Sequence, residues 1–561
     1  MLHHISTRQK IIVMLAVMSG LFLVALDQTI IATALAAITT EFDSFSSLGF
    51  IVTAYLLTST VTVPIAGKLS DMYGRRPILL GGVIVFTLSS LLSGLAHNVE
   101  WLIAMRAVQG IGGGMIMANA FTIIGDLFSP RERGKWQGMI GAVFGISSII
   151  GPLLGGWLTD GQNIFGLMTD WRWTFFINVP IGIIAGLVIA RYAPQIVGEK
   201  KHRPDYVGAL WITLALSSLV LAVDNTETIF KALVDQGVAV GLIKLVLWII
   251  AFISAGLFVH AEVRAKEPIL PLRFFKNKTY SLMLTAMLLF GAAFLGAILY
   301  LTQFNQQVFG VTASEAGLML LPMIGGLMVS SIAVGQLVAK TGVYKYFLVA
   351  GFALATVSIY TLSFLTPEST YLNEAISMVF IGIGMGMAMP ILNLAVQNEF
   401  TQKDLGAATS SVQLFRGLGS TVGTAVLSGV LTAGIMNSIG SADNLPYIET
   451  LKKSPESAKM LSDGEITADT LLQVNAQKQT IRDAATSSIN ALPLPTAVKQ
   501  QQTDKFVAEQ DDFSKTVIGA FGDSLQNVFR ISAFLMALAT VVVVFVKNKK
   551  LRSDVHATPG E

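Results

Sequence analysis

Very few ionisable residues interrupt the long apolar stretches of this chain, and these few are the first candidates for chemistry. Asp27 and Arg106 stand well inside apolar runs, and Lys244 and Arg416 stand inside two others. Burying an ionisable group among apolar residues is costly, so such a residue marks a substrate or proton pathway unless packing explains it. Five further acids lie at the ends of apolar runs, where we expect them to reach water: Asp126, Asp160, Asp224, Glu374 and Glu399.

Asp27 is the leading candidate for a proton carrier. Burial disfavours the charged form of a carboxylate and a nearby cation favours it, so a site that alternates between these environments can load and release a proton. Arg106 would supply the cation, or would only bind backbone carbonyl groups. The alternative for Asp27 is a packing role, in which neighbouring hydroxyl groups bond to the carboxylate.

The composition places these residues in a membrane protein. Of the 561 residues, 53% are hydrophobic and 13% are charged, and the mean hydropathy is +0.65, whereas a soluble domain has about 25% charged residues. This composition excludes a disordered chain, a coiled coil and a nucleic-acid binder. The chain has no cysteine, no HExxH pattern and no Gx4GK[ST] loop, so we expect no metal, no cofactor, no ATP-driven pump and no enzyme.

Long apolar segments recur along almost the whole chain. A membrane-spanning helix needs about 20 mostly apolar residues. The sequence therefore predicts an all-α, polytopic membrane protein with fourteen spans, at 11–36, 49–67, 77–96, 101–125, 136–158, 173–193, 206–223, 238–260, 279–302, 313–338, 345–365, 374–396, 408–434 and 526–547.

The distribution of Lys and Arg predicts the orientation of these spans. Loops after even-numbered spans are rich in both residues, as at Lys68, Arg75 and Arg76, whereas the short opposite loops contain almost none except Arg172 and Lys231. Short loops rich in Lys and Arg stay in the cytoplasm. We therefore expect a multi-pass protein of the plasma or inner membrane, of bacterial type, with both termini cytoplasmic.

Residues 438–525 form the one long polar segment, on the predicted extracytoplasmic side. Residues 467–488 show helical periodicity, the sequence NALPLP at 490–495 interrupts it, and residues 498–523 are predicted to be helical and to continue into the last span. We expect a surface cap or spacer. Docking of an extracytoplasmic partner or of substrate is the alternative.

The loop between the second and third spans carries a distinctive sequence, GKLSDMYGRRPILL at 67–80. Gly67 and Gly74 permit a tight turn, and Asp71 can cap backbone N–H groups or pair with a neighbouring arginine. Ordinary positive-inside anchoring is the alternative. A weaker copy, GQLVAKTGVYK at 335–345, indicates two duplicated six-span halves with the seventh and eighth spans inserted between them, which is a transporter architecture.

Several motifs together resemble those of the major facilitator superfamily. They are the loop at 67–80, LIAMRAVQGIG at 102–112, LDQTII at 26–31 and WRWTFFINVPIG at 171–182, of which the last two resemble the fourteen-span drug:proton antiporter branch, the multidrug or quaternary-ammonium resistance type. The resemblance implies two six-helix bundles plus two additional helices. It also implies proton coupling at Asp27 and Arg106 and a gating role for the loop residues Gly67, Asp71, Gly74, Arg75 and Arg76.

The fifth span resembles the motif associated with antiporters, with Ser147 in place of a usual glycine. Small residues let helices approach closely, and a Gly-Pro pair weakens the backbone ladder and can kink the helix. Plain helix packing is the alternative. The residues concerned are Gly138, Gly151, Pro152, Gly155 and Gly156.

Polar residues in later spans are candidates for the wall of a substrate cavity: Gln303, Asn305, Gln306, Asn393, Gln397, Gln413 and Arg416. Antiporters of this branch that take dications often have a second acid in the thirteenth span, but this span has Arg416 and no acid. One carboxylate cannot balance two charges in a low dielectric. We therefore expect monocationic or neutral substrates.

The predicted function is a proton-coupled antiporter that exports amphipathic drugs or toxic compounds by alternating access, as a monomer in the lipid bilayer. One alternative is an exporter of a lipid or lipid-linked metabolite, and another is a non-transporting sensor or scaffold that uses the external loop. The predicted parts are an N-terminal six-helix bundle at 1–194, two inserted helices with linkers at 195–278, a C-terminal six-helix bundle at 279–437 and 526–547, the loop at 438–525 and a cytoplasmic tail at 548–561.

Overall fold

The computed structural model describes residues 6–42, 48–159, 161–164, 166–193, 204–223, 226–311, 313–440, 445–452, 466–493 and 495–551. Within these residues, fourteen helical segments are long and apolar enough to cross a membrane, which confirms the predicted number of spans.

The first half of the molecule contains six spans. They are α1 (Thr7–Glu41), α2 (Leu48–Tyr73), α3 (Arg75–Gly94), α4 (Val99–Leu127), α5 (Pro130–Thr159), and the pair α6 (Trp173–Phe176) and α7 (Asn178–Tyr192), which together form the sixth. Two short strands, β1 (Asn163–Ile164) and β2 (Leu167–Met168), lie between α5 and α6 and pair antiparallel, with Asn163 opposite Met168. The apolar core of this half lies between α1, α3, α4 and α7.

The second half contains the other six-span unit, with one large apolar core. Its helices are α12 (Lys278–Phe309), α13 (Ala313–Leu318), α14 (Leu321–Thr341), α15 (Lys345–Leu362), α16 (Tyr371–Glu399), α17 (Leu405–Ile439) and α22 (Thr496–Val544). The short helix α13 and α14 together make the tenth span. The 3-10 helices η3 (Leu272–Lys276) and η4 (Gln402–Asp404) precede α12 and α17.

Two further spans, α8 (Tyr206–Val223) and α11 (Val240–Arg264), pack against each other, with the short helices α9 (Thr226–Ile229) and α10 (Lys231–Val234) between them. The helix α8 packs on α2, and a small apolar cluster that includes Val61, Ile212 and Leu414 joins α2, α8 and α17. The inserted pair thus lies beside both halves rather than within either bundle.

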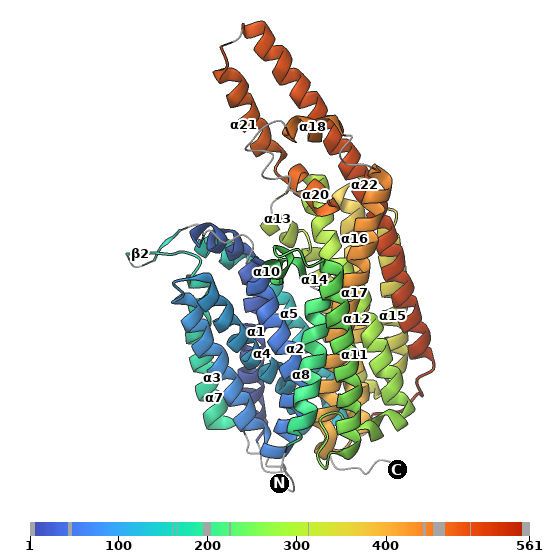
Figure 1. Ribbon diagram of the computed structural model, residues 1–561. Coiled ribbons are helices and arrows are strands. Elements are labelled where there is room, and N and C mark those ends of the chain that lie inside the picture. Colours follow the sequence, from blue (N-terminus) through green and yellow to red (C-terminus); the bar gives the residue numbers. More distant parts are fainter. Residues whose placement is uncertain are drawn as a thin grey trace.

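Figure 1 shows the two halves side by side, with the first half in blue and the second in green, yellow and orange. The start of α1 and the end of α22 lie at one end of the molecule, here termed the termini end. At the opposite end, here termed the hairpin end, α21 (Lys478–Ala491) and the first part of α22 project away from the bundle.

Several helices are longer than the apolar runs that predict them. The helix α17 continues to Ile439 and contains 35 residues, a length of about 52 Å at about 1.5 Å per residue. Hydropathy marks only the part of a helix that matches the hydrocarbon core, which is about 30 Å thick. The helix backbone itself continues into the aqueous layer because its hydrogen bonds are internal.

The polar segment at the hairpin end is helical, as predicted from its periodicity. The last helix, α22, is continuous over 49 residues and joins the external segment to the last span. The helices α18 (Pro446–Lys452), α20 (Ala468–Ala476) and α21 pack on it. The Tyr447 ring packs against Phe513 at an interplanar angle of 42°, with ring centroids 5.0 Å apart. The Gln510 amide donates to the Tyr447 hydroxyl at 2.8 Å.

This external unit is attached to the second half by polar contacts with α12. The Asn475 amide of α20 donates to Gln307 Oε1 at 2.9 Å. Gln307 Nε2 donates to the Leu472 carbonyl at 3.4 Å. The external unit therefore rests on the outer ends of α12 and α17, and its buried apolar residues continue the core of the second half.

Deleting residues 445–510 and joining the ends with a short Gly/Ser linker should leave the protein inserted in the membrane. The flanking spans keep their own backbone hydrogen bonds, so their insertion does not depend on the external core. Membrane fractionation and thermal unfolding in detergent, compared with the full chain, measure this. Complete loss of insertion would contradict the expectation, whereas normal insertion with loss of export would favour a docking role for the segment.

Candidate functional site

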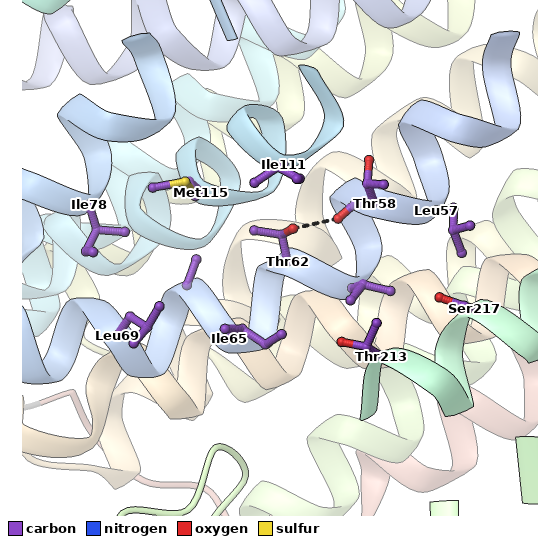
Figure 2. Close-up of a pocket in the computed structure, with 12 residues that line it drawn as sticks. Leu57, Thr58, Thr62, Ile65, Leu69, Ile78, Ile111, Met115, Thr213 and Ser217 are labelled. Carbon is purple, nitrogen blue, oxygen red and sulfur yellow. Dashed lines mark hydrogen bonds between the residues drawn. The ribbon is translucent and has the colours of Figure 1, made fainter. Parts of the chain in front are cut away.

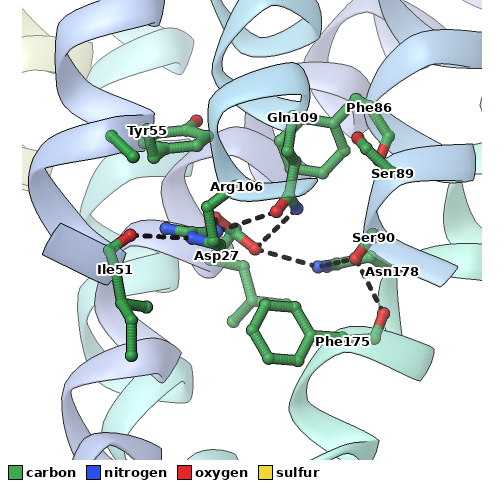
Figure 3. A network of polar contacts seen from close by, with 12 residues as sticks. Asp27, Ile51, Tyr55, Phe86, Ser89, Ser90, Arg106, Gln109, Phe175 and Asn178 are labelled. Carbon is green, nitrogen blue, oxygen red and sulfur yellow. Dashed lines mark hydrogen bonds and ion pairs between the residues drawn. The ribbon is translucent and has the colours of Figure 1, made fainter. Parts of the chain in front are cut away.

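Asp27 lies at the centre of a fully buried polar network in the first half (Figure 3). Its Oδ2 atom is 2.5 Å from Arg106 NH1. Its Oδ1 atom accepts a hydrogen bond from Gln109 Nε2 at 2.8 Å and one from Asn178 Nδ2 at 3.3 Å. The network joins α1, α4 and α7 at one carboxylate, so the charge of Asp27 is balanced by one cation and solvated by two amides.

Arg106 is enclosed by groups that suit a guanidinium. Its NH1 donates to Gln109 Oε1 at 2.8 Å and its Nε donates to the Ile51 carbonyl of α2 at 3.3 Å. The guanidinium carbon lies 4.5 Å from the centroid of the Tyr55 ring, within cation–π range. Arg106 therefore binds both the carboxylate and a backbone carbonyl, so the two roles considered from the sequence occur together.

Three polar residues of this network were not predicted as site residues, namely Gln109, Asn178 and Ser90. Asn178 is fully buried and donates to Ser90 Oγ at 3.1 Å as well as to Asp27, and Ser90 Oγ in turn donates to the Phe175 carbonyl at 2.9 Å. The available signal was the one asparagine in the otherwise apolar stretch FINVPIG of the sixth span. A polar amide inside a span usually bonds to another polar group there.

An ion pair at the hairpin end explains one exception to the charge pattern. Arg172 NH2 and NH1 donate to the two carboxylate oxygens of Glu41 at 2.7 and 2.9 Å. The Trp171 indole N–H donates to Glu41 Oε2 at 2.6 Å. The hydrogen bonds from Arg172 hold the pKa of the Glu41 carboxyl below its ordinary value. Arg172 thus ties the end of α1 to the start of the sixth span.

The predicted loop motif forms a second buried charge cluster, at the termini end. Asp71 Oδ1 is 2.5 Å from Arg75 NH1, and Arg75 Nε is 2.7 Å from Asp126 Oδ2 of α4. Asp71 also accepts hydrogen bonds from the backbone N–H groups of Gly406 at 3.0 Å and Ala407 at 2.8 Å, at the start of α17. A carboxylate at a helix N-terminus is favoured by the free N–H groups and the helix dipole. Asp71 therefore links the two halves.

The remaining loop residues support this link. Gly74 has φ 98°, a conformation that favours glycine, and separates α2 from α3. A Cβ at Gly67 would meet the Ser410 side chain of α17, and the Gly406 carbonyl would lie 2.9 Å away. Arg76 donates to the Ala190 carbonyl of α7. One part of the motif, which includes Gly67, therefore contacts the second half, whereas Arg76 links α3 to α7 within the first half.

The fifth-span motif faces two different helices. A Cβ at Gly151 would meet Thr29 of α1, and one at Gly155 would meet Thr33, so both glycines permit close approach of α1 and α5. A Cβ at Gly138 would meet the Ser331 carbonyl of α14, in the second half. Gly156 faces no atom within 4 Å. Pro152 stands inside the continuous helix α5. The motif therefore serves packing within the first half and across the two halves.

The acids at span ends are less accessible than the sequence suggests. Asp126 is 2% exposed and pairs with Arg75. Glu399 accepts hydrogen bonds from Lys549 Nζ at 2.8 Å and from Asn277 Nδ2 at 2.7 Å. Glu374 is fully buried. The expectation that these three reach water is wrong, because helices and loops continue past the apolar runs and cover them. Asp160 and Asp224 lie outside the described residues.

The predicted cavity residues do not form one site. Near the termini end, Gln413 Nε2 donates to Asn393 Oδ1 at 3.1 Å. Gln397 instead bridges the halves, because Gln137 of α5 donates to its Oε1 at 3.0 Å and its own amide donates to the Phe121 carbonyl of α4 at 2.9 Å. Arg416 follows Gln413 by three residues, on the same side of α17, is half-buried and has no acid acting on it among the described residues.

The other three cavity candidates lie toward the hairpin end of α12. Gly291 of α12 is beside the Arg416 carbonyl, and Gln303 follows it by twelve residues, or about 18 Å along a helix. Gln306 Nε2 donates to the Thr302 carbonyl at 3.4 Å. Asn305 is fully buried. The structure therefore divides the candidates between the two ends of the second half.

A cavity of about 410 Å³ lies away from all of these residues (Figure 2). It is formed on α2, α3, α4 and α8, and its wall is apolar except for four hydroxyl groups. Those hydroxyls belong to Thr58, Thr62, Thr213 and Ser217. The cavity therefore lies on the flank of the first half beside an inserted helix, and not between the two halves.

The fold and the buried charges define a polytopic membrane transporter and not an enzyme. Residues 17–424 match the sequence profile of the Major Facilitator Superfamily, and the chain belongs to that family. It is 36% identical to the multidrug transporter protein MdtP of Bacillus subtilis, over 95% of this chain and 92% of that protein. It is 30% identical to multidrug resistance protein 3 of the same species, over 97% of both chains.

A solved structure shows the same fold. The proton:xylose symporter XylE matches 97% of this chain and 98% of its own, with a TM-score of 0.59 and 13% identity. The family assignment makes the non-transporting sensor or scaffold considered from the sequence wrong. The resemblance to the superfamily and the all-α fold are confirmed.

The α1–α5 contact gives a test with an internal control. Gly151→Ala should lower the thermal unfolding midpoint, since the added methyl group must displace Thr29 and overpacking costs about 1–3 kcal/mol. Gly156→Ala, five residues along, should not change it, because Gly156 faces open space. Thermal unfolding of the purified variants in one detergent measures both. Equal midpoints for the two variants would rule out the packing role of Gly151.

The link between the halves gives a second test. Asp71→Asn should slow export at normal membrane levels, because it removes charge-assisted hydrogen bonds to α17 that contribute about 1.5–3 kcal/mol. A change of about 1.4 kcal/mol shifts an equilibrium tenfold. The matched control is Glu267→Gln, which removes a 2.7 Å ion pair with Lys68 of α2 but no contact with α17. Wild-type export kinetics in Asp71→Asn vesicles would exclude a gating role.

Proposed function

We propose that this protein is a proton-coupled antiporter that exports amphipathic, monocationic or neutral compounds by alternating access. The observation that carries the proposal is the fully buried Asp27 carboxylate, held by Arg106, Gln109 and Asn178. Relatives at 36% and 30% identity bear the names multidrug transporter and multidrug resistance protein, which supports export of drug-like compounds.

Proton coupling follows from how Asp27 is neutralised. In the ionised state, its charge is balanced by Arg106 at 2.5 Å. Protonation removes that balance and leaves a buried arginine without its anion, which is strongly unfavourable unless the network rearranges. Proton binding therefore biases the arrangement of α1, α4 and α7. A membrane potential of 100 mV supplies about 2.3 kcal/mol per charge and one pH unit about 1.4 kcal/mol, so one proton supports substantial uphill export.

Alternating access is supported by the contacts across the halves. At the termini end, Asp71 caps α17, Gln137 bonds to Gln397, and Gly134 lies against Gly335. These contacts fit a state in which the termini end is closed. Opening the termini end breaks only this small set of polar and small-residue contacts. Rigid-body rocking between two states requires an interface of this kind, which can separate and form again.

The substrate class follows from the balance of buried charge. Asp27, which lies inside the first span, is already paired with Arg106. Arg416 adds a cation to the second half with no acid acting on it among the described residues. A dication would face a net repulsion there, whereas a neutral or singly charged amphipathic compound would not.

The orientation and the parts of the molecule complete the proposal. The distribution of Lys and Arg supports a bacterial plasma or inner membrane protein with both termini cytoplasmic. We expect a monomer, divided as the sequence predicts. The segment 438–525 would then lie outside the cell, where it offers a surface for a partner.

Export of a lipid is a second candidate, and the flank cavity is the observation that favours it. This cavity is mostly apolar and is lined by α2, α3, α4 and α8, a composition that suits a lipid chain. Everted vesicles supplied in parallel with a dye cation and with a labelled lipid separate the two candidates, because each predicts accumulation of a different compound.

Asp27→Asn should abolish uphill export in everted vesicles while the protein remains at normal levels in the membrane. The amide cannot carry the proton, so substrate movement is no longer coupled to the pH gradient. A pH-sensitive dye inside the vesicles reports the proton released when substrate is added.

The control for this variant is Glu100→Gln, which changes an exposed acid at the start of α4 and should couple normally. Proton release by Asp27→Asn vesicles at the wild-type rate would place the proton site elsewhere. Absence of substrate-dependent proton release in the wild-type protein would reject antiport itself.

A further inference from the structure

Glu374 is a buried acid for which the proposed mechanism has so far no use. It lies in the first turn of α16, toward the hairpin end, and is fully buried. Neither of its carboxylate oxygens makes a well-formed hydrogen bond with any described residue. Most buried polar atoms in proteins are hydrogen-bonded, so two unbonded carboxylate oxygens in one side chain require an explanation.

The neighbour of Glu374 across the helix contact is a second buried polar side chain. Asn305 of α12 is fully buried and interacts with the Glu374 carboxyl, although no well-formed hydrogen bond joins the two side chains. On its own helix, the nearest titratable group is Tyr371, whose hydroxyl donates to the Met319 carbonyl at 2.8 Å. The two side chains form a small polar layer between α12 and α16 within an otherwise apolar core.

No cation neutralises Glu374. The helices packed against α16 are α5, α12, α14, α15 and α17, and no described Asp, Glu, Lys, Arg or His on them acts on this carboxyl. Glu315 of α13, at the same end, is exposed. The contrast is with Glu399 at the other end of α16, which pairs with Lys549, and with Asp27, which pairs with Arg106.

An unpaired carboxylate is too costly to bury, so the group takes up a proton instead. Burial without a cation therefore favours the neutral, protonated form of Glu374 in this conformation. Ionising it requires water or a new partner, and so requires α12 and α16 to separate around Asn305. The same stretch of α12 holds the external unit through Gln307, two residues along, so such a separation is linked to the hairpin end.

We propose that Glu374 is a second proton-binding site, loaded from water at the hairpin end, whose neutral form allows α12 and α16 to close and whose ionised form opens them. The proton comes from water at that end and returns to it when the contact opens. This role rests on the proposed antiport function, since it supplies a response to external pH in addition to the coupling at Asp27.

The chain has no native cysteine, so a single introduced thiol reports opening directly. Met378 lies one turn deeper than Glu374 and is fully buried. In a Met378→Cys protein, labelling by a membrane-impermeant maleimide from the hairpin side should rise several-fold more between pH 6 and pH 8 than in the same protein carrying Glu374→Gln. The thiol's own ionisation is common to both proteins and cancels in the comparison.

The Gln variant is suited to this test because an amide has the shape of the neutral acid and should leave the fold intact. The matched control, Glu368→Gln, changes an exposed acid six residues earlier and should keep the wild-type labelling profile. The proposal would be overturned if labelling had the same pH profile with Glu and with Gln at position 374. It would also be overturned if labelling at constant pH changed with the Na⁺ concentration.

Transport gives a second readout that separates this proposal from the function on which it rests. Export by Glu374→Gln vesicles should remain coupled to protons but lose most of its dependence on the pH of the vesicle interior, which corresponds to the hairpin side. If wild-type vesicles show no proton coupling, the proposed function fails whatever the labelling shows. If they couple and Glu374→Gln keeps the wild-type pH dependence, only the role of Glu374 fails.

Discussion

The buried ion pair between Asp27 and Arg106 is the constraint to which the first half of the molecule conforms. Two charges of opposite sign, each almost completely removed from water, are tolerable only with good geometry and further hydrogen bonds. Gln109 and Asn178 donate hydrogen bonds to the Asp27 carboxylate. The Arg106 guanidinium donates to the Ile51 carbonyl and lies over the Tyr55 ring. Four helices contribute to one charge pair, so a change in its protonation acts on all four at once.

The contact between the two halves depends on close backbone packing and a few hydrogen bonds instead of a buried ion pair. Glycines permit backbone approach, as at Gly134 against Gly335 and Gly138 against Ser331, and a few polar bonds fix the register. The bonds made by Asp71 are distinctive, because its carboxylate pairs with Arg75 in its own half and also accepts hydrogen bonds from the first N–H groups of α17. An interface of this kind is specific yet buries few charges across it, which fits the alternating access that we propose.

The second half distributes its polar groups along its length instead of gathering them in one network. Arg416 and Gln413 lie toward the termini end, whereas Asn305 and Glu374 lie under the external unit. This separation gives the two ends of the half different chemistry. The external unit extends the apolar core of this half outward and is joined to α12 by amide contacts as well.

The sequence alone determined the number of spans, the two-half organisation and the identity of the first buried acid, because hydropathy and the positions of Asp27 and Asp71 are local properties of the chain. It also indicated the helices of the external segment, including the continuation of the last of them into the fourteenth span. Sequence did not reveal that Asn178 and Ser90 join Asp27, that Asp71 reaches α17 across 335 positions, or that Gln397 belongs to the contact between halves. Only tertiary structure decided these points, and it also decided that Glu374 and Asp126 are buried, since burial of a residue at a helix end depends on which distant helices cover it.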